Sequence, residues 1–381
     1  MVRRIMAAAG GVVVKDEDLP GLGPGDVLVR AAYSVISPGT ERSIVRATRV
    51  SVSAAHEYPA PGQQWRQVRS AWVDARPRLP RTPPPDAASL GYSLAGIVER
   101  TGGDVLNLRP GDRVACAGSQ CAYHAEQVVV PRSLVVPVPD GVGLADAAHV
   151  TLGAIALEAF RRTKTAVGET VVVIGAGMLG LLITQIARRA GVYVVAVDTD
   201  PRRRALADRF GAARSVPAAD GAAVAAVRGV TDGFGADAAI VAAAGPGSEL
   251  INFSFAALRP GGRTVALGDF GMDIDRHEFF GAQATFVPSI AYGPGRYDPV
   301  YEENNVDLPI SVVRWTENRN MAFFLRLLAD KHVDLAPLPR AELRFADAAQ
   351  AYERLLNAGD VVTAVLRYDQ GSQQGYDQAG Q

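Results

Sequence analysis

The sequence is poor in cysteine. Only two of its 381 residues are cysteines, Cys116 and Cys121. Two thiols are too few for a disulfide scaffold or for a zinc site built from four thiolates. We therefore read both as small apolar residues. Such sparing use of cysteine favours a reducing compartment, and we expect a cytoplasmic protein.

The sequence also lacks an excess of charge of either sign. Thirty-nine basic and forty acidic side chains leave a net charge of −1, and they are interspersed along the chain. Nothing in this pattern attracts the phosphates of a nucleic acid, so we expect no nucleic-acid partner. No segment reaches the roughly 20 apolar residues that span a bilayer, so we expect no membrane partner. The apolar start, MVRRIMAAAGGVVV, reads as the first strand of a soluble protein.

The composition that remains is that of a globular chain with a full core. Hydrophobic residues make up 48% and charged residues 21%. At about 150 residues per domain, the length predicts two domains. Up to about residue 150, short valine-rich runs at 27–35, 95–99 and 127–130 alternate with Pro-Gly and Gly-Asp turns, which predicts an irregular β domain. Within it, residues 44–86 indicate a helical excursion and an extended loop.

From about residue 151 the pattern changes to strands alternating with helices. Residues 171–174, 192–197, 236–242 and 264–267 read as strands, and residues 179–190 and 201–210 read as helices. This succession predicts an α/β fold with a doubly wound parallel sheet, that is, a Rossmann domain.

After about residue 290 the alternation stops. A polar loop at 291–305 leads to helices near 318–330 and 346–357 and to a strand at 361–368. We expect domain boundaries of 1–152, 153–290 and 291–368, followed by a polar, disordered tail at 369–381.

The strongest chemical signal is a glycine motif. Gly175, Gly177 and Gly180 spell G-x-G-x-x-G between a predicted strand and a predicted helix, which is the context of a dinucleotide site. Such glycines permit a tight turn, close approach of a pyrophosphate and close packing of helix on strand. The free N–H groups at the start of the helix, at Met178 and Leu179, would then face the phosphates.

An acidic residue follows at the expected interval. Asp198 ends the second strand, 18 residues after Gly180, where a carboxylate would hold the ribose diol and repel a 2′-phosphate. This favours NAD over NADP. Arg202, Arg203 and Arg204 follow directly and could accept a 2′-phosphate, so NADP remains open.

Further motifs lie at intervals along the chain: GYSLAGIV (91–98), PGDRV (110–114), residues 123–130 and LRPGGRTVALG (258–268). With the glycine motif, they make residues 1–368 similar to the medium-chain dehydrogenase/reductase superfamily of the alcohol dehydrogenase type. The resemblance implies a GroES-like β-rich catalytic domain, a Rossmann domain and a C-terminal return to the catalytic domain, with substrate between the two domains. Cofactor contacts are then expected from Gly175, Gly177, Met178, Leu179, Gly180, Asp198, Arg203 and Gly268.

The residues that hold zinc in metal-dependent members are absent. Where that family often has a Cys before Gly-Thr-Asp, this chain reads Ser37-Pro38-Gly39-Thr40-Glu41, and where it often has Gly-His-Glu, this chain reads Gly91-Tyr92-Ser93. Thr151 or Gly153 stands in the region of the third ligand. Hydroxyls do not provide the ligands that zinc prefers. The sequence therefore predicts an enzyme with no metal.

A narrower resemblance is carried by SVISPGTE, VTLGAIALEAF, YGPGRYDPVYEENN and VRWTENRNM. These segments look like a zinc-independent subgroup that includes bacteriochlorophyllide dehydrogenases and the N-terminal half of two-part oxidoreductases of surface sugar biosynthesis. In the latter a second oxidoreductase domain follows, whereas this sequence stops at Gln381.

Without zinc, a hydrogen-bond donor must polarise the carbonyl group. Tyr92 stands where a ligand is lost, and either donates a phenolic proton or packs against the wall of the site. Thr40 falls where the family has a hydroxyl proton relay. Glu41 and Ser37 are further candidates, with structural support of the loop as the alternative for Glu41. His124 and His149 lie in segments that the resemblance places near the site, and we include His149 among the catalytic candidates.

These observations favour a zinc-independent, NAD(P)-dependent dehydrogenase or reductase acting on a secondary alcohol or ketone of a polar sugar-like, aminosugar-like or cyclitol-like molecule. Secondary metabolism is a setting that fits. The polar residues of 292–318 either line a hydrophilic pocket or cap a helix and brace a dimer edge. A quinone or enone reductase, or a nucleotide-binding sensor without turnover, is the alternative. By analogy with the family we expect a homodimer formed through the edge strand of the Rossmann sheet.

Overall fold

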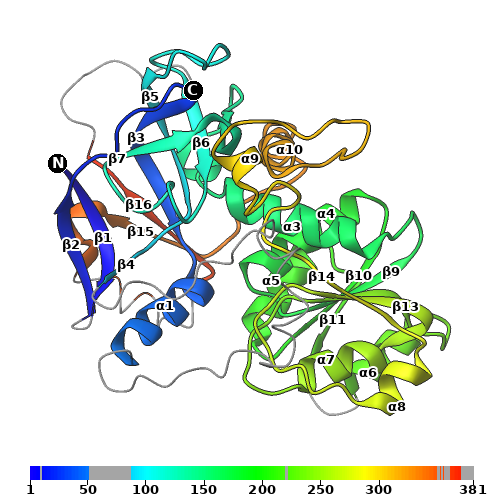
Figure 1. The fold of residues 1–381 in the computed structure, drawn as a ribbon. Coiled ribbons are helices and arrows are strands. Elements are labelled where there is room, and N and C mark those ends of the chain that lie inside the picture. The colour runs from blue at the N-terminus through cyan, green and yellow to red at the C-terminus, as the bar shows by residue number, and fades with distance from the viewer. Residues whose placement is uncertain are drawn as a thin grey trace, which may run out of the picture.

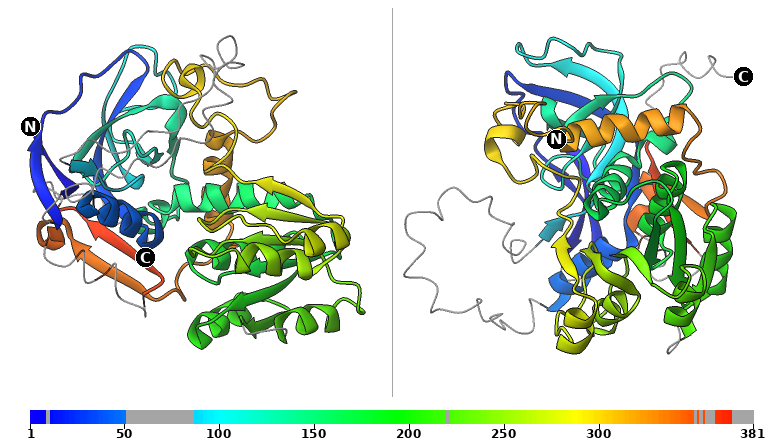
Figure 2. Two further views of the ribbon diagram at one scale, coloured as in Figure 1. Left: turned by 60° about the horizontal axis from the view of Figure 1, so that its bottom comes forward. Right: turned by 90° about the vertical axis from the view of Figure 1, so that its right-hand side faces the viewer.

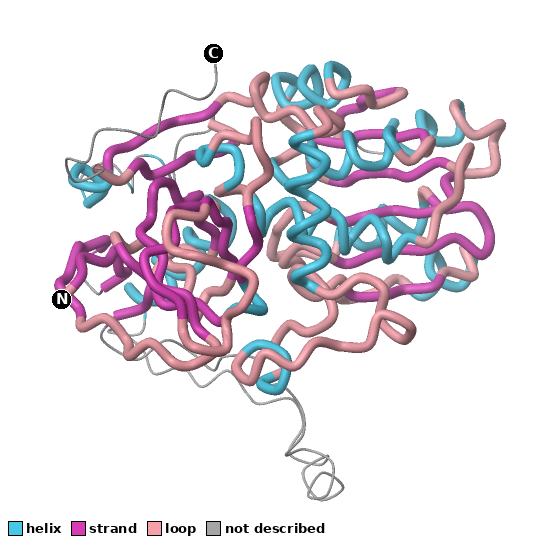
Figure 3. The backbone as a smooth tube through the Cα atoms, turned by 90° about the horizontal axis from the view of Figure 1, so that it is seen from above, coloured by secondary structure: helices cyan, strands magenta, loops and turns pink. Residues whose placement is uncertain are grey.

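The computed structural model describes residues 1–8, 11–50, 87–218, 222–349, 352, 355 and 361–369. Figure 1 shows a β-rich half, which contains the N-terminal strands and the last strand, beside a half in which helices flank one sheet. Figures 2 and 3 show the same division from other sides. In these residues no helix has the length and apolarity needed to cross a membrane.

The second half is the expected Rossmann domain. Its six parallel strands follow the order β11-β10-β9-β12-β13-β14. Strands β10 and β11 are added on one side of β9 and strands β12 to β14 on the other, so the switch point lies between β9 and β12. The strands are β9 (Thr170–Ile174), β10 (Tyr193–Asp198), β11 (Arg214–Pro217), β12 (Ala236–Val241), β13 (Leu258–Ala266) and β14 (Thr285–Pro288). The helices are α4 (Met178–Arg189), α5 (Pro201–Arg209), α6 (Ala222–Gly229), α7 (Glu249–Ala256) and α8 (Arg276–Gly281).

Strand β9 explains why this sheet forms. All five of its residues are buried. Val171 and Val173 belong to the core under α4, whereas Val172 and Ile174 belong to a second core with Ile251 of α7. A strand covered on both faces requires an unbroken β-branched run, which is what the sequence has. The α/β fold class is therefore confirmed.

The first half contains two sheets. One has the order β2-β1-β4, and the other has the order β15-β16-β3-β5-β6-β8, with β7 also paired to β3. The strands are β1 (Val2–Ala8), β2 (Gly11–Glu17), β3 (Asp26–Ile36), β4 (Ala87–Ser89), β5 (Ser93–Thr101), β6 (Arg113–Ala117), β7 (Gln127–Pro131), β8 (Val135–Pro137), β15 (Arg340–Arg344) and β16 (Thr363–Arg367). The N-terminal segment that reads as one strand is two: β1 and β2 pair antiparallel from Ala8 opposite Gly11. Gly11, with φ 120°, permits the reversal.

Short helices complete this half. They are α1 (Pro38–Val50), η2 (Arg132–Leu134), α2 (Leu144–Ala147), α9 (Pro299–Glu302), α10 (Glu317–Ala329) and η3 (Phe345–Asp347). The expected excursion at 44–86 begins earlier, as α1 at Pro38, and its part beyond Val50 lies outside the described residues. Most of the helix expected at 346–357 and the tail beyond residue 369 also lie outside them.

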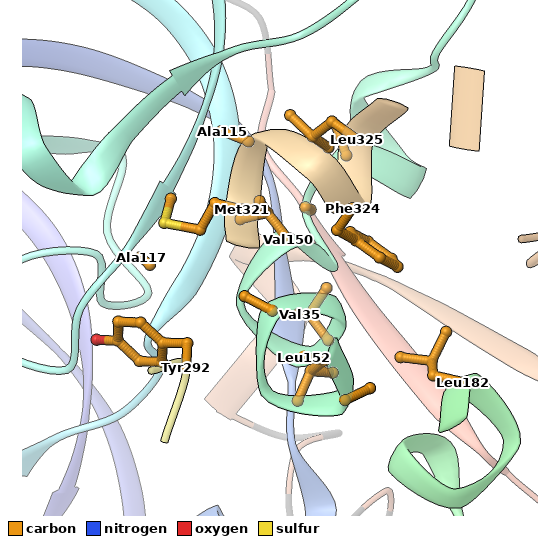
Figure 4. Close-up of a cluster of buried hydrophobic side chains, with 14 of the residues drawn as sticks. Val35, Ala115, Ala117, Val150, Leu152, Leu182, Tyr292, Met321, Phe324 and Leu325 are labelled. Carbon is orange, nitrogen blue, oxygen red and sulfur yellow. The ribbon is translucent and has the colours of Figure 1, made fainter. Parts of the chain in front are cut away.

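Helix α3 (Val150–Thr163) joins the two halves, so the expected boundary at 152/153 falls inside a helix. Figure 4 shows Val150 and Leu152 of α3 gathered with Val35 and Ala115 of the β-rich half, Leu182 of α4, and Met321 and Phe324 of α10. Gly153 lies against Phe324, and a Cβ atom there would come within 2.1 Å of the phenyl ring. One continuous core therefore runs through α3.

Candidate functional site

The turn from β9 to α4 has the geometry of a phosphate-binding loop. Gly175 has φ 98°, and a Cβ atom on it would meet Ala243 at 2.9 Å. A Cβ atom on Gly180 would lie 1.9 Å from the carbonyl oxygen of Gly175. A Cβ atom on Gly177, the N-cap of α4, would meet nothing within 4 Å. Gly175 and Gly180 are thus required by packing, whereas Gly177 borders open space at the N-terminal end of α4, where a helix offers free N–H groups.

Asp198 lies under this loop at the end of β10. Its Oδ2 accepts the N–H of Ala176 at 2.7 Å, its Oδ1 accepts the N–H of Asp200 at 2.8 Å, and its side chain is buried. Each carboxylate oxygen has a second lone pair. Asp198 therefore braces the loop and keeps acceptor capacity for a ribose hydroxyl.

The three arginines after Asp198 differ in what they contact. Arg202 pairs with Asp200, the N-cap of α5, at 3.0 Å. Arg204 donates to the carbonyl oxygens of Asp198 and Thr199 at 2.8 and 3.0 Å. Arg203 is half-buried, and its Nε has no hydrogen-bond partner. Arg203 is accordingly the arginine in this group with an uncommitted buried donor.

Gly268, which follows β13, completes this edge of the sheet. Its N–H donates to the carbonyl oxygen of Val241 at 2.8 Å. A Cβ atom on it would lie 1.9 Å from the carbonyl oxygen of Ala243, the residue that also contacts Gly175. The loops after β9, β12 and β13 therefore meet at the carboxyl edge, beside the switch point where α/β sheets bind ligands.

In the β-rich half, Tyr92 forms a cluster with residues at the start of α1. Its phenol is hydrogen-bonded to the side chains of Ser37 and Thr40, and Glu41 is close enough to influence its ionisation. Burial raises the pKa of Tyr92 to about 12; the charge of Glu41 raises it further, and the bonds to Ser37 and Thr40 oppose the shift. Tyr92 itself is half-buried. The structure thus brings together four of the five predicted catalytic residues.

Glu41 is fixed by the start of its own helix. Pro38 occupies the first turn of α1, where its missing N–H costs nothing. Glu41 Oε1 accepts the N–H of Ser37 at 2.9 Å, while the N–H of Glu41 donates to the carbonyl oxygen of Ser37 at 2.9 Å. The side-chain bond and the first backbone bond of α1 together fix an entirely buried carboxylate near Tyr92.

The backbone of Tyr92 is tied to α3. Its carbonyl oxygen accepts the hydroxyl of Thr151 and the N–H of Gly118, both at 3.1 Å. Ser93, which is buried, donates to the carbonyl oxygen of Ala148 at 2.6 Å and accepts the N–H of Thr151 at 3.1 Å. Because α3 also packs on α4, the helix that begins at the glycine loop, one rigid element connects the Tyr92 cluster to the loop.

His149 has a different environment from the one expected of a proton donor. It is fully buried; Nδ1 faces the carbonyl oxygens of Ala145 and Asp146 at 3.1 and 3.2 Å, and Nε2 lies 2.8 Å from the Thr363 hydroxyl. These acceptors require a proton on Nδ1, so Nε2 accepts from Thr363. Burial lowers the pKa of His149 to about 4. Such a neutral, fully bonded imidazole fits a structural link between α3 and β16.

Two polar residues of 292–318, Arg296 and Asn318, bind neighbouring segments. Arg296 is buried and donates to Glu302, to Gln120 at 3.1 Å and to Ser119 at 3.1 Å. The side-chain amide of Asn318 donates to the carbonyl oxygens of Ser133 and Val135 at 2.8 and 3.2 Å. These contacts commit Arg296 and Asn318 to partners within the chain, which speaks against their lining a pocket, and the expected bracing of a dimer edge stays a prediction.

Comparison with known proteins agrees with this geometry. Residues 23–140 match the model of the alcohol dehydrogenase GroES-like domain, and residues 179–303 match that of zinc-binding dehydrogenase. The chain belongs to the medium-chain dehydrogenase/reductase superfamily.

The sequence identity to individual relatives is low or covers only part of the chain. Galactitol 1-phosphate 5-dehydrogenase of Escherichia coli (strain K12) is 32% identical over 151 residues, which is 32% of this chain and 44% of that protein. An alcohol dehydrogenase of Cupriavidus necator is 24% identical over 414 residues, 96% of this chain and 98% of that protein. The match to galactitol 1-phosphate 5-dehydrogenase thus spans less than half of that protein.

Solved structures of the superfamily share the fold. Galactitol-1-phosphate dehydrogenase from Escherichia coli has a TM-score of 0.69 at 19% identity, covering 96% of this chain and 99% of that one. A quinone oxidoreductase of Pseudomonas syringae pv. Tomato DC3000 has a TM-score of 0.69 at 20% identity, covering 96% and 100%. At such identities the likeness concerns the fold alone.

Where the resemblance places the ligands of zinc, the side chains of this chain are not those that zinc prefers. Ser37, Tyr92 and Thr151 offer hydroxyls, and the Thr151 hydroxyl is donated to a backbone carbonyl. Zinc sites in proteins use thiolate, imidazole and carboxylate ligands. Within the described ranges no three His, Cys, Asp or Glu side chains gather in a way that could hold a metal. Cys116 and Cys121 are free, buried thiols whose pKa values burial raises.

Two further residues of interest, Ser34 and Tyr368, were not predicted from the sequence. Ser34 lies on β3 and Tyr368 directly follows β16, and Ser34 contacts both His124 and Tyr368. No motif marks them, because their meeting depends on pairing of β3 with β16, more than 300 residues apart.

Proposed function

We propose that this protein is an NAD(P)-dependent oxidoreductase that interconverts a secondary alcohol and a ketone without zinc. The observation that carries the proposal is the half-buried Tyr92 phenol, bonded to Ser37 and Thr40, at a position where metal-dependent relatives have a ligand. With a pKa of about 12, this phenol stays protonated at neutral pH and can donate a hydrogen bond to a carbonyl oxygen.

The residues around the glycine turn suit a dinucleotide, which supplies or accepts the hydride when bound. The open space at Gly177, before the N–H groups that begin α4, suits the pyrophosphate. Asp198 would accept from the adenine ribose, and its charge favours NAD over NADP. Arg203, with its unpartnered Nε, is the group that would favour NADP instead.

Tyr92 then acts on the substrate oxygen. In ketone reduction it hydrogen-bonds the carbonyl oxygen and gives up its proton as negative charge develops there. An acid with a pKa near 12 remains more acidic than a simple alcohol, so the transfer is favourable. Ser37 and Thr40, through their hydrogen bonds to the phenol, stabilise the phenolate that results.

For the substrate we propose a polar sugar-like, aminosugar-like or cyclitol-like alcohol or ketone. Support comes from relatives whose names specify polyols or sugar acids, galactitol 1-phosphate 5-dehydrogenase and, at 28% identity over 223 residues, L-idonate 5-dehydrogenase of Vitis vinifera. The loop 291–305 lends less support than its sequence suggests, because Arg296 is committed to neighbouring side chains.

The test replaces Tyr92 with Phe. Galactitol 1-phosphate and L-idonate are offered with NAD and NADP, and D-xylulose with NADH and NADPH. General acid catalysis typically contributes about 10²-fold or more, so we expect kcat to fall by at least that factor while cofactor affinity, followed by fluorescence, is unchanged. Tyr193→Phe, at an exposed tyrosine of β10, is the matched control. A loss below about tenfold in the Tyr92 variant would contradict the proposed role.

A separate measurement tests zinc independence. Protein purified without chelators is subjected to elemental analysis, and we expect substoichiometric zinc with activity unaffected by a chelator. One zinc per chain, lost together with activity, would overturn this part of the proposal.

The same assays separate the alternatives. Reduction of 1,4-benzoquinone or an enone with none of the polyols or ketoses turned over would indicate a quinone or enone reductase, the class to which one structural neighbour belongs. Cofactor binding without turnover of any of these compounds would indicate a sensor.

A further inference from the structure

Behind Tyr92, four buried polar side chains form a continuous series of hydrogen bonds. Glu41 Oε2 lies 3.3 Å from His124 Nε2, His124 Nδ1 lies 2.7 Å from Ser34 Oγ, and Ser34 Oγ lies 2.8 Å from the Tyr368 hydroxyl. Glu41, His124 and Ser34 are 0% exposed and Tyr368 is 4% exposed. Four separate segments of the chain are thus brought together away from water.

The series runs from the Tyr92 cluster toward an exposed face. At one end Glu41 accepts the N–H of Ser37, whose hydroxyl bonds Tyr92. At the other end the Tyr368 ring stacks on Phe345 at 4.7 Å, and the guanidinium of Arg3 lies 5.7 Å from the Phe345 ring centre. Arg3 pairs with Glu126, and their side chains are 51% and 36% exposed.

The chemistry of the four groups suits proton movement. Tyr368 can donate to Ser34, Ser34 to Nδ1 of His124, and Nε2–H of His124 to Glu41, so that every donor points toward the carboxylate. Reversal of all donors gives an equally complete arrangement. An imidazole accepts a proton on one nitrogen as it releases one from the other, without rotating. Burial of a carboxylate and an imidazole for packing alone would cost stability that apolar side chains would not.

We propose that Tyr368, Ser34, His124 and Glu41 form a proton relay that restores the proton Tyr92 gives to its substrate. This inference rests on the proposed function. In ketone reduction, hydride adds to the carbonyl carbon and the carbonyl oxygen takes the Tyr92 proton, which leaves a phenolate beside Glu41. A proton taken up at the Tyr368 end then passes through Ser34 and His124 to Glu41, and the carboxyl group of Glu41 returns it to the Tyr92 phenolate beside it. In alcohol oxidation each transfer runs in reverse.

Within the part of the chain that the structure describes, ionisable side chains of several elements face His124. Glu41 of α1 faces Nε2, Tyr368 faces Nδ1 through Ser34, and the ring of Tyr352 meets the imidazole edge-on at 6.0 Å. Burial raises the pKa values of Tyr368 and Tyr92, so both phenols remain protonated over the range in which the enzyme is assayed. Gly91, before Tyr92, leaves room for the imidazole: a Cβ atom there would lie 2.6 Å from Nδ1.

The first experiment needs no substrate. Full-length protein is labelled with ¹⁵N-histidine, His124 is assigned by its loss in His124→Gln, and exchange of its ring proton with D₂O is followed by NMR. A working relay predicts fast exchange in spite of full burial, slowed about tenfold or more in Tyr368→Phe, which removes only the terminal hydroxyl. A ring proton that persists for hours in the wild-type protein, or an exchange rate equal in Tyr368→Phe, overturns the relay.

The second experiment measures turnover of D-xylulose, or of whichever panel ketone the enzyme reduces, in Tyr368→Phe and Ser34→Ala. We expect unchanged melting temperature and cofactor KM, a lower kcat, a larger solvent isotope effect and a smaller effect of deuterium at C4 of the reduced cofactor, because proton supply becomes limiting. A purely structural role would leave both isotope effects as in the wild type. If the exchange result holds but Tyr92→Phe retains full turnover, the proposed function fails and the relay's proton conduction stands.

Discussion

At the scale of single residues, Glu317 carries a carboxyl group that is removed from water. It is fully buried at the start of α10, and neither carboxylate oxygen has a hydrogen-bond partner. Burial raises the pKa of Glu317 to about 9, Glu302 adds to the shift, and Arg296 opposes it. Glu317 is therefore a neutral acid in the folded protein at pH 7.

The raised pKa of Glu317 makes the free energy of unfolding depend on pH. Between about pH 4.5 and pH 9 the folded protein retains a proton on Glu317 that the unfolded chain has released, so stability falls as pH rises through this window. The slope from one such group is at most about 1.4 kcal/mol per pH unit. Glu317→Gln removes the titration. We expect its thermal melting temperature to approach that of the wild type near pH 4.5 and to exceed it increasingly toward pH 9.

The control for this measurement is Glu249→Gln, at an exposed first-turn glutamate of α7. Its melting curve should stay parallel to the wild type at every pH. Parallel curves for Glu317→Gln as well would show that Glu317 is ionised in the folded state.

At the scale of elements, two glycines of the turn between β9 and α4 have different roles: Gly180 permits close packing, and Gly177 leaves space for a ligand. Gly180→Ala would press a methyl group on the carbonyl oxygen of Gly175, whereas Gly177→Ala, at φ −75°, would strain nothing. We expect Gly177→Ala to keep the wild-type melting temperature but bind NADH more weakly, because the methyl group enters the space assigned to the pyrophosphate. Gly180→Ala should lose both stability and binding. Calorimetry and fluorescence titration distinguish them, and full NADH affinity in Gly177→Ala would place the phosphates elsewhere.

This turn also shows where sequence-based prediction succeeds. The elements around it were predicted to within a residue or two, because a continuous buried run, a glycine motif and helical spacing are all local signals. Strands β11 and β14 were missed because each is short and largely accessible to solvent, without a hydrophobic alternation. Strand β15 was missed although Ala341 and Leu343 alternate with charged residues, because so short an alternation is a weak signal. The N-terminal hairpin was read as one strand because both its arms are apolar.

The contacts of the candidate site likewise include some that the sequence predicts and some that it does not. The meeting of Tyr92, Ser37, Thr40 and Glu41 was anticipated from aligned motifs. The bond between His149 and Thr363 was not, and neither were the contacts of Ser34 with His124 and Tyr368. Each of these joins residues brought together only by strand pairing or by packing of α3, and no local pattern encodes such partners.

At the scale of the whole molecule, β14 is the edge of the Rossmann sheet, paired with β13 on one side only. Unpaired backbone groups on an edge strand favour addition of another strand. Apolar side chains nearby are exposed, among them Phe280 at 58% and Ile290 at 50%. We therefore expect the homodimer to form through this edge.

Light scattering coupled to size-exclusion chromatography tests this expectation. The wild type should elute with twice the chain mass of 40.1 kDa. Phe280→Asp should shift the protein toward monomer, while Phe234→Asp, at a phenylalanine that is 73% exposed and precedes β12, should not. A wild-type monomer at micromolar concentration would contradict the dimer.

The placement of β16 has a consequence for biosynthesis. This strand lies between β15 and β3, so the sheet opened by residues 26–36 is closed only by residues 363–367. As the nascent chain leaves the ribosome, the Rossmann strands and helices can pack while the edge of β3 that will pair with β16 is still without a partner strand. The β-rich half therefore matures after the Rossmann half, and Tyr368 reaches Ser34 only when β16 has paired with β3.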